Sequence, residues 1–191
     1  KASFTPTSSL SYGETYHISY PSGCFTNTGG DVDYVGTAYT FGVKSYLFSL
    51  WAWGNSISGQ LGLNDQGESK YSSPVQIPGT TWTSAGRTLG GAQSFGIKSD
   101  GTLWAWGSSS YGRLGQNKGP GHDRSSPVQL PGTTWTDACS RQSGALALKT
   151  DGTLWTWGKN NLGQLGQNTT IRYSSPIQIP GTTWASMDSH G

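Results

Sequence analysis

Residues 100–115 read Asp-Gly-Thr-Leu-Trp-Ala-Trp-Gly-Ser-Ser-Ser-Tyr-Gly-Arg-Leu-Gly, and this stretch decides the fold. Its Trp-Ala-Trp-Gly core has counterparts at residues 51–54 and 155–158, at intervals of about 50 residues. Each core is followed by a Gly-x-Leu-Gly segment, at residues 59–62, 112–115 and 163–166. A Ser-Ser-Pro block ending in Trp completes each unit, at residues 72–82, 125–135 and 174–184. All nine tryptophans belong to these blocks, so we interpret them as framework residues of an internal repeat.

Each repeat is expected to fold as short β-strands. Ser94–Ser99 and Leu103–Trp106 alternate on either side of Asp100-Gly101, which predicts a hairpin with a type I′ turn. The prolines that bracket Val75–Ile77 predict a short edge strand, because proline has no N–H to donate. The glycines of Gly-x-Leu-Gly predict left-handed turns or a close approach of backbones. Since no window shows helical amphipathicity, the chain is predicted to be all-β.

A period of about 50 residues with about four strands per unit is typical of a β-propeller blade. The order Trp-x-Trp-Gly, Gly-x-Leu-Gly, Ser-Pro-Val-x-Ile-Pro and Asp-Gly-x-Leu-Trp resembles the regulator-of-chromosome-condensation repeat, over residues 43–191. Kelch and WD repeats have similar periods but carry double-glycine and Gly-His/Trp-Asp signatures that are missing here. The resemblance implies a propeller of about seven blades. Because the chain holds fewer than three repeats, we expect it to be truncated, with further blades beyond residue 191.

Residues 1–42 do not match the repeat. They contain an alternating strand at Thr15–Tyr20, a Gly-rich loop at residues 29–31 and a second strand-like run at residues 38–41. This pattern resembles the C-terminal part of a bacterial immunoglobulin-like β-sandwich of the surface-layer type. Residues 40–44 also align with residues 94–98 of the next repeat, so we expect a strand to pass directly from this module into the first blade.

Composition and charge limit the classes of partner. Charged residues make up 12% of the chain and the net charge is +2, against about 25% charged residues in a typical soluble protein. We therefore expect neither a nucleic-acid partner nor an anionic membrane partner. No apolar run approaches the ~20 residues that span a bilayer, so membrane insertion is not expected either. Cys24 and Cys139 leave a disulfide open, although two buried thiols are favoured.

No catalytic constellation is recognisable. The sequence has no nucleophile elbow, P-loop or His-Glu-x-x-His motif, so we expect no enzyme activity, no cofactor and no metal site. Binding specificity usually lies in loops that vary on a constant framework. The variable loops of the second repeat hold Tyr111, Arg113, His122 and Arg124, which are the candidate ligand-binding residues. For residues 122–124, a solvated loop is the favoured alternative.

The two resemblances together are similar to appendage proteins of cyanobacteria-infecting phages. They imply a non-enzymatic virion or extracellular protein, a fibre, tail or capsid decoration, that displays propeller loops to a host glycan or surface protein. The alternative is a bacterial secreted or cell-surface adhesin, and a guanine-nucleotide exchange factor or enzyme-inhibiting propeller is less favoured. Other virion or surface proteins are the expected partners, and homo-oligomerisation stays open.

Overall fold

The computed structural model describes residues 15–18, 39–42, 48–65, 70–88, 92–141 and 143–187. The chain divides into two compact units, Lys1–Tyr46 and Leu47–Gly191. Apart from one 3-10 turn, η1 (Ser110–Gly112), every regular element in these residues is a β-strand, which confirms the all-β prediction. None of the described residues belongs to a helix long and apolar enough to cross a membrane.

The first unit contains one described pair of strands. β1 (Thr15–Ile18) pairs antiparallel with β2 (Tyr39–Gly42), so that Thr15 lies opposite Gly42. An immunoglobulin-like sandwich is not shown by this pair. Cys24 and residues 43–47, where a strand was expected to enter the first repeat, lie outside the described residues.

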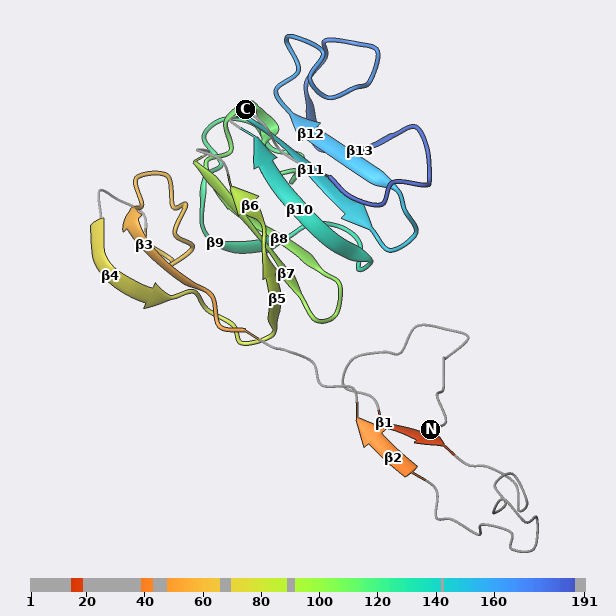
Figure 1. Cartoon of the computed structure of the whole chain (residues 1–191). Helices are drawn as coiled ribbons and strands as arrows, with labels where there is room; N and C mark the ends of the chain where they lie inside the picture. The colour runs from red at the N-terminus through yellow and green to blue at the C-terminus, as the bar shows by residue number, and fades with distance from the viewer. Residues whose placement is uncertain are drawn as a thin grey trace, which may run out of the picture. The chain divides into compact units, whose positions relative to one another are not determined.

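The second unit consists of three sheets in chain order (Figure 1). The second and third each contain the four antiparallel strands of a propeller blade, and the third also has a short fifth strand, β6 (Arg87–Thr88), at its edge. The first sheet pairs β3 (Trp51–Asn55) with β4 (Lys70–Gln76). The second sheet has the order β5-β7-β8-β9, with bounds Trp82–Ala85, Gln93–Lys98, Leu103–Gly107 and Arg124–Gln129. The third contains β10 (Trp135–Arg141), β11 (Gly144–Lys149), β12 (Leu154–Gly158) and β13 (Tyr173–Ile179). The proline-containing strands β4, β9 and β13 lie at sheet edges, as predicted.

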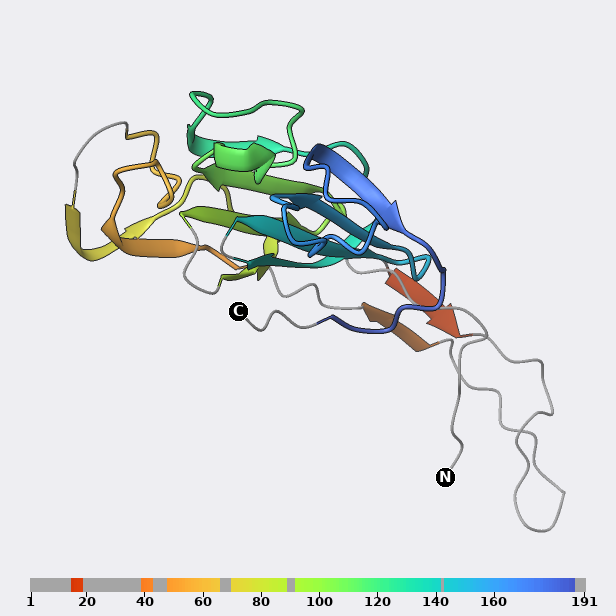
Figure 2. The ribbon, with the colours of Figure 1, turned by 90° about the horizontal axis from the view of Figure 1, so that it is seen from above.

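A short parallel pairing links the second and third sheets. β6 (Arg87–Thr88) follows β5 along the chain but pairs with β10, Arg87 opposite Cys139. The chain therefore continues from β5, at the edge of the second sheet, into β6, which lies beside β10 of the third sheet. Figure 2 shows the second and third sheets lying one over the other.

The Asp-Gly hairpins form, but with a different turn from the one predicted. In β7–β8 the amide of Lys98 donates to the oxygen of Thr102, so the loop has three residues rather than two. Of these, Gly101 has a φ of +73° and Asp100 is not left-handed, which contradicts the type I′ prediction. The Asp100 carboxylate accepts hydrogen bonds from the amide (3.0 Å) and hydroxyl (2.6 Å) of Thr102 instead. The carboxylate, not a second left-handed residue, therefore stabilises the reversal.

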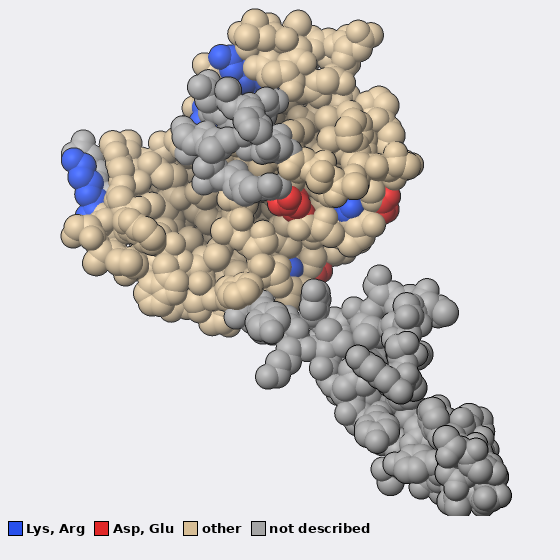
Figure 3. Space-filling model, viewed as in Figure 1, with Lys and Arg blue, Asp and Glu red and all other residues tan. Residues whose placement is uncertain are grey.

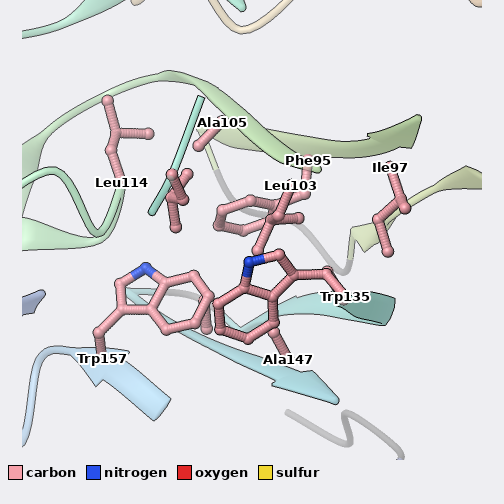
Figure 4. Packing of buried hydrophobic residues seen from close by; sticks show 11 residues of the cluster. Phe95, Ile97, Leu103, Ala105, Leu114, Trp135, Ala147 and Trp157 are labelled. Atoms are coloured by element: carbon pink, nitrogen blue, oxygen red, sulfur yellow. The ribbon is translucent and has the colours of Figure 1, made fainter. Parts of the chain in front are cut away.

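The main core lies between the second and third sheets (Figure 4). Phe95 from β7 meets Trp157 from β12 edge to face, with ring centroids 5.7 Å apart. Ile97 and Leu103 close the same layer from the second sheet, and Trp135 from the third. Aromatic pairs of this geometry contribute about 0.5–1.5 kcal/mol beyond the area that they bury. This core fixes the two blades against one another.

A repeated hydrogen bond joins each sheet to the next. The indole of Trp106 donates to the main-chain oxygen of Gln60 (3.0 Å), one repeat earlier, and that of Trp157 donates to the oxygen of Arg113 (2.8 Å). The Gly-x-Leu-Gly turns allow this approach, because a Cβ on Gly62 would lie 2.8 Å from the Trp106 nitrogen. The glycines of all three turns have positive φ, and a Cβ on Gly59 would lie 2.6 Å from the Cα of Ser125. The prediction of left-handed turns and close backbone approach is therefore confirmed.

The tryptophans do not share one environment. Trp82, Trp106 and Trp157 are buried, whereas Trp51, Trp53 and Trp184 are exposed by 54%, 61% and 41%. The framework role inferred for all nine tryptophans therefore fits the buried ones more closely than the exposed ones.

Cys139 is buried in β10, with its sulfur 4.0 Å from that of Met187.

Candidate functional site

Tyr111 has a backbone that sets it apart from its counterparts. It lies in η1 with φ +60° and ψ +12°, in the left-handed region that non-glycine residues seldom adopt. The corresponding residues of the other repeats, Ser58 and Leu162, are not left-handed. Its side chain is 40% exposed. A strained residue of this kind is retained when the surrounding structure forces it, and such residues cluster at functional sites.

Two cations flank the Tyr111 ring. The Lys159 ammonium lies 5.3 Å from the ring centroid and the Arg113 guanidinium carbon lies 5.9 Å from it, both within cation–π range. Lys159 comes from the third repeat, directly after the end of β12. Cations from two successive repeats therefore lie within reach of the same ring.

Tyr111 and Lys159 open onto a pocket of about 390 Å³ on the second unit. Its other lining residues are Asn160, Asn161, Thr170 and Arg172, so the lining has two cations and no carboxylate. Figure 3 shows that charged side chains are scattered over the described part of the face in view, with uncharged surface between them. Lys159 and Arg172, which line one pocket, therefore concentrate positive charge locally on a surface where charges are otherwise scattered.

Side-chain hydrogen bonds to the buried residues Asn160 and Ser109 hold the variable loops in place. In the third repeat the Asn160 amide donates to the main-chain oxygens of Thr169 and Ile171, both at 2.8 Å. In the second repeat Asp123 accepts from the amide (2.8 Å) and hydroxyl (2.9 Å) of Ser109. The loops differ in sequence, but each is bonded to the rigid segment that follows a Trp-x-Trp-Gly strand.

Arg113 is buried between the sheets. It is 8% exposed, and its guanidinium donates to the side-chain oxygen of Gln93 (3.2 Å), the hydroxyl of Ser143 (3.4 Å) and the main-chain oxygen of Ser110 (3.0 Å). Burial lowers the pKa of Arg113 below its ordinary value. Arg113 does not line the pocket itself, but it lies behind one of its walls, beside the Tyr111 ring.

The four residues singled out from the sequence do not share one pocket. Tyr111 and Arg113 are in contact, as described above. His122 is exposed, its amide bonded to the Ser109 hydroxyl (3.0 Å). Arg124 lines a separate pocket of about 360 Å³, together with Lys118.

Lys159 and Arg172 were missed by the sequence analysis. Lys159 replaces Asn55 and Ser108 of the earlier repeats directly after Trp-x-Trp-Gly, and this difference is the signal that was available. The proximity of Lys159 to Tyr111 depends on how two sheets pack, which no local pattern reports.

Known proteins resemble this chain over its repeats. The sequence profile of the "Regulator of chromosome condensation (RCC1) repeat" matches residues 49–86, 100–145 and 151–186, more than half of the chain. The E3 ubiquitin-protein ligase HERC2 of Homo sapiens is 31% identical over 126 residues, which are 64% of this chain and 2% of HERC2. The protein RCC2 homolog of Danio rerio is 39% identical over 80 residues, 40% of this chain and 16% of the relative. The chain thus spans a small part of these curated relatives.

Solved structures show the same fold. Human WBSCR16 has a TM-score of 0.59 and 23% identity, covering 69% of this chain and 33% of that one. Prp20p of Saccharomyces cerevisiae, described with its binding properties to Gsp1p and histones, has a TM-score of 0.59 and 16% identity. The superposition covers 76% of this chain and 40% of Prp20p.

These relatives correct the expected function. The curated relatives named here are animal proteins of the RCC1-repeat type, so the prediction of a phage fibre, tail or decoration protein is wrong. The bacterial adhesin offered as its alternative falls with it. The resemblance to the repeat family, in contrast, is confirmed by the profile and by the solved structures. The chain belongs to the family of the regulator of chromosome condensation (RCC1) repeat.

Proposed function

We propose that this segment is a non-catalytic, protein-binding part of an RCC1-like regulator, and that its pocket beside Tyr111 receives an acidic segment of a partner protein. The observation that carries the proposal is Tyr111, whose backbone is left-handed and whose partly exposed ring lies beside Lys159. Arg172 lines the same pocket. A carboxylate entering the pocket would meet two cations and no competing acid. The tyrosine ring would cover the aliphatic part of the bound side chain.

The relatives support a protein partner. The solved structure of Prp20p is described with its binding to Gsp1p and histones, and a further structure shows Kap60 bound to yeast RCC1 (Prp20). These partners belong to Prp20p, and the present chain covers 40% of it. For this chain, these descriptions support only the expectation that its partner is a protein. The particular partner has to follow from the chemistry of its own pocket.

Fluorescence anisotropy tests the proposal. The probe is a labelled peptide of alternating Glu and Gly, and the same peptide with Gln in place of Glu is the ligand control. We expect the acidic peptide to bind, and Lys159→Gln combined with Arg172→Gln to weaken binding about tenfold or more. The matched control removes the same charge elsewhere, by Lys70→Gln with Lys118→Gln at two exposed positions, and should leave affinity nearly unchanged.

Two results would count against the proposal. Equal loss in both double variants would reduce the binding to net charge, with no role for the pocket. Equal affinity for the Glu and Gln peptides would remove the acidic specificity. Added salt should weaken specific binding, because the charges of this open pocket are screened.

We also propose that residues 1–42 form part of an immunoglobulin-like module. The antiparallel pair β1–β2 supports this, since its strands lie within the matching pattern. Hydrogen exchange on the intact chain tests it, because a sandwich would protect amides well beyond these two strands.

A further inference from the structure

The pocket of about 360 Å³ beside Arg124 is built entirely from the second and third sheets and the loop between them. Its walls come from the loop after the second Gly-x-Leu-Gly turn, from β9 and from Ser175 of β13. Lys118 and Arg124 are its charged lining residues, and within the described part of the chain no carboxylate lines it. Val128 and Pro131 give it an apolar wall. The pocket is therefore positively charged on one side and apolar on another.

The two cations occupy repeat positions that face one another. Lys118 and Asp65 each follow the left-handed asparagine of their loop, and Arg124 and Tyr71 each precede a Ser-Ser-Pro block. Both pairs are six positions apart. In the first repeat the Tyr71 hydroxyl donates to the Asp65 carboxylate at 2.7 Å. The fold thus brings these two positions into contact.

The second repeat replaces this hydrogen-bonded pair with two like charges. The Arg124 guanidinium donates to the main-chain oxygen of Asp123 at 3.4 Å, while the Asp123 carboxylate accepts from Ser109. Like charges at neighbouring positions repel one another. An anion that meets both Lys118 and Arg124 would remove this repulsion. The charge pattern of the pocket therefore favours an anionic ligand.

We propose that this pocket binds a phosphate group carried by a serine or threonine side chain of a partner protein. A phosphate monoester carries a charge of about −1.5 to −2 at pH 7, which the two cations balance. The planar guanidinium of Arg124 can donate to two phosphate oxygens at once. The apolar wall of Val128 and Pro131 suits a side chain next to the phosphorylated residue. A nucleic acid fits less well, because its backbone needs many cations and the net charge of the chain is +2.

Fluorescence anisotropy with the 191-residue chain tests the proposal. The probe is a labelled peptide of Gly and Ser that carries one phosphoserine, and the unphosphorylated peptide is the ligand control. Lys118→Gln combined with Arg124→Gln should weaken phosphopeptide binding about tenfold or more. The matched control, Lys159→Gln with Arg172→Gln, removes the same charge from the Tyr111 pocket and should change the affinity by less than about twofold. The Glu-Gly peptide should show the opposite pattern, so the two binding proposals can fail separately.

A second variant separates lost binding from lost structure. Lys118→Asp combined with Arg124→Tyr installs the hydrogen-bonded pair of the first repeat at the same positions and spacing. It should abolish phosphopeptide binding, and its midpoint in urea should be equal to or higher than that of the original chain, because a hydrogen bond replaces a repulsion.

Four outcomes would overturn the proposal. Equal losses in the two double Gln variants would attribute binding to net charge, and equal affinity for the phosphorylated and unphosphorylated peptides would exclude a phosphate site. Inorganic phosphate that displaces the probe as well as the unlabelled phosphopeptide does would make free phosphate the ligand. Tighter binding of a labelled single-stranded oligonucleotide, lost in Lys118→Gln with Arg124→Gln, would make nucleic acid the ligand.

Discussion

The indole nitrogen of Trp157 donates a 2.8 Å hydrogen bond to the main-chain oxygen of Arg113, forty-four positions earlier in the chain. Trp157 is fully buried. The guanidinium of Arg113 in turn donates hydrogen bonds to the side chains of Gln93 and Ser143. Arg113 thus joins two sheets, because its main-chain oxygen accepts from the Trp157 indole and its guanidinium donates to Gln93 and Ser143. The stability of the second unit should depend strongly on it.

Trp157→Phe should therefore destabilise the second unit by about 1–3 kcal/mol, because a buried carbonyl loses its donor. The matched control is Trp53→Phe, the same change at the same position of the first repeat, where the side chain is 61% exposed. It should alter the free energy of unfolding by no more than about 0.5 kcal/mol. Urea denaturation at low protein concentration measures both. Equal effects would show that the indole hydrogen bond does not join the sheets.

Gly112→Ala should destabilise the chain more than Gly121→Ala. Both glycines are left-handed, with φ of +75° and +84°, so both substitutions carry similar backbone strain. A Cβ on Gly112 would lie 2.6 Å from the Cα of Ser174, whereas one on Gly121 meets nothing within 4 Å. The excess should be about 1–3 kcal/mol in denaturant unfolding, the usual cost of overpacking. Equal losses would mean that the two sheets separate easily at this contact.

Acid should weaken the Asp-Gly hairpins. The hydrogen bond from the Thr102 hydroxyl lowers the pKa of Asp100, and that from Thr153 lowers the pKa of Asp151. Because these pKa values are lower in the folded state, the stabilisation is present at neutral pH and is lost as pH falls through the lowered values. Thr102→Val should raise the pKa of Asp100 toward its ordinary value, as followed by carboxyl carbon NMR. Thr133→Val, at an exposed position, is the control. An unchanged Asp100 titration in Thr102→Val would contradict the assignment.

Tyr111→Asn should separate stability from binding. Asparagine adopts the left-handed conformation more readily than tyrosine, so the melting temperature should stay constant or rise. Binding of the Glu-Gly peptide should fall, because the ring beside Lys159 is lost. Tyr111→Phe keeps both the ring and the backbone strain and should bind like the original chain. Retained binding by Tyr111→Asn would show that the strained tyrosine serves another purpose.

The sequence was sufficient for the repeat architecture because its signals are local. Asp-Gly between alternating runs, proline in the outer strand and glycine in each Gly-x-Leu-Gly turn all act within a few residues. The predicted type I′ turn was wrong, because the hydrogen bond from the Thr102 amide to the Asp100 carboxylate stabilises the turn without a second left-handed residue. A rule based on the Asp-Gly dipeptide alone does not include that hydrogen bond.

The candidate site depended on contacts that are distant in sequence. Arg113 was expected in a binding loop, but Gln60 and Gln164 occupy its position in the other repeats, which indicates a framework position. Lys159 reaches Tyr111 only because the second and third sheets pack together. The phage prediction failed for a related reason: the repeat pattern reports how blades pack, and packing does not identify a partner.

An NMR titration of the isotope-labelled chain with the Glu-Gly peptide tests the central claim most directly. The account predicts amide shift changes that cluster at Tyr111, Lys159 and Arg172 and saturate together. Shift changes centred instead on the loop at residues 116–124, or no changes where the anisotropy assay reports binding, would contradict the pocket as the binding site.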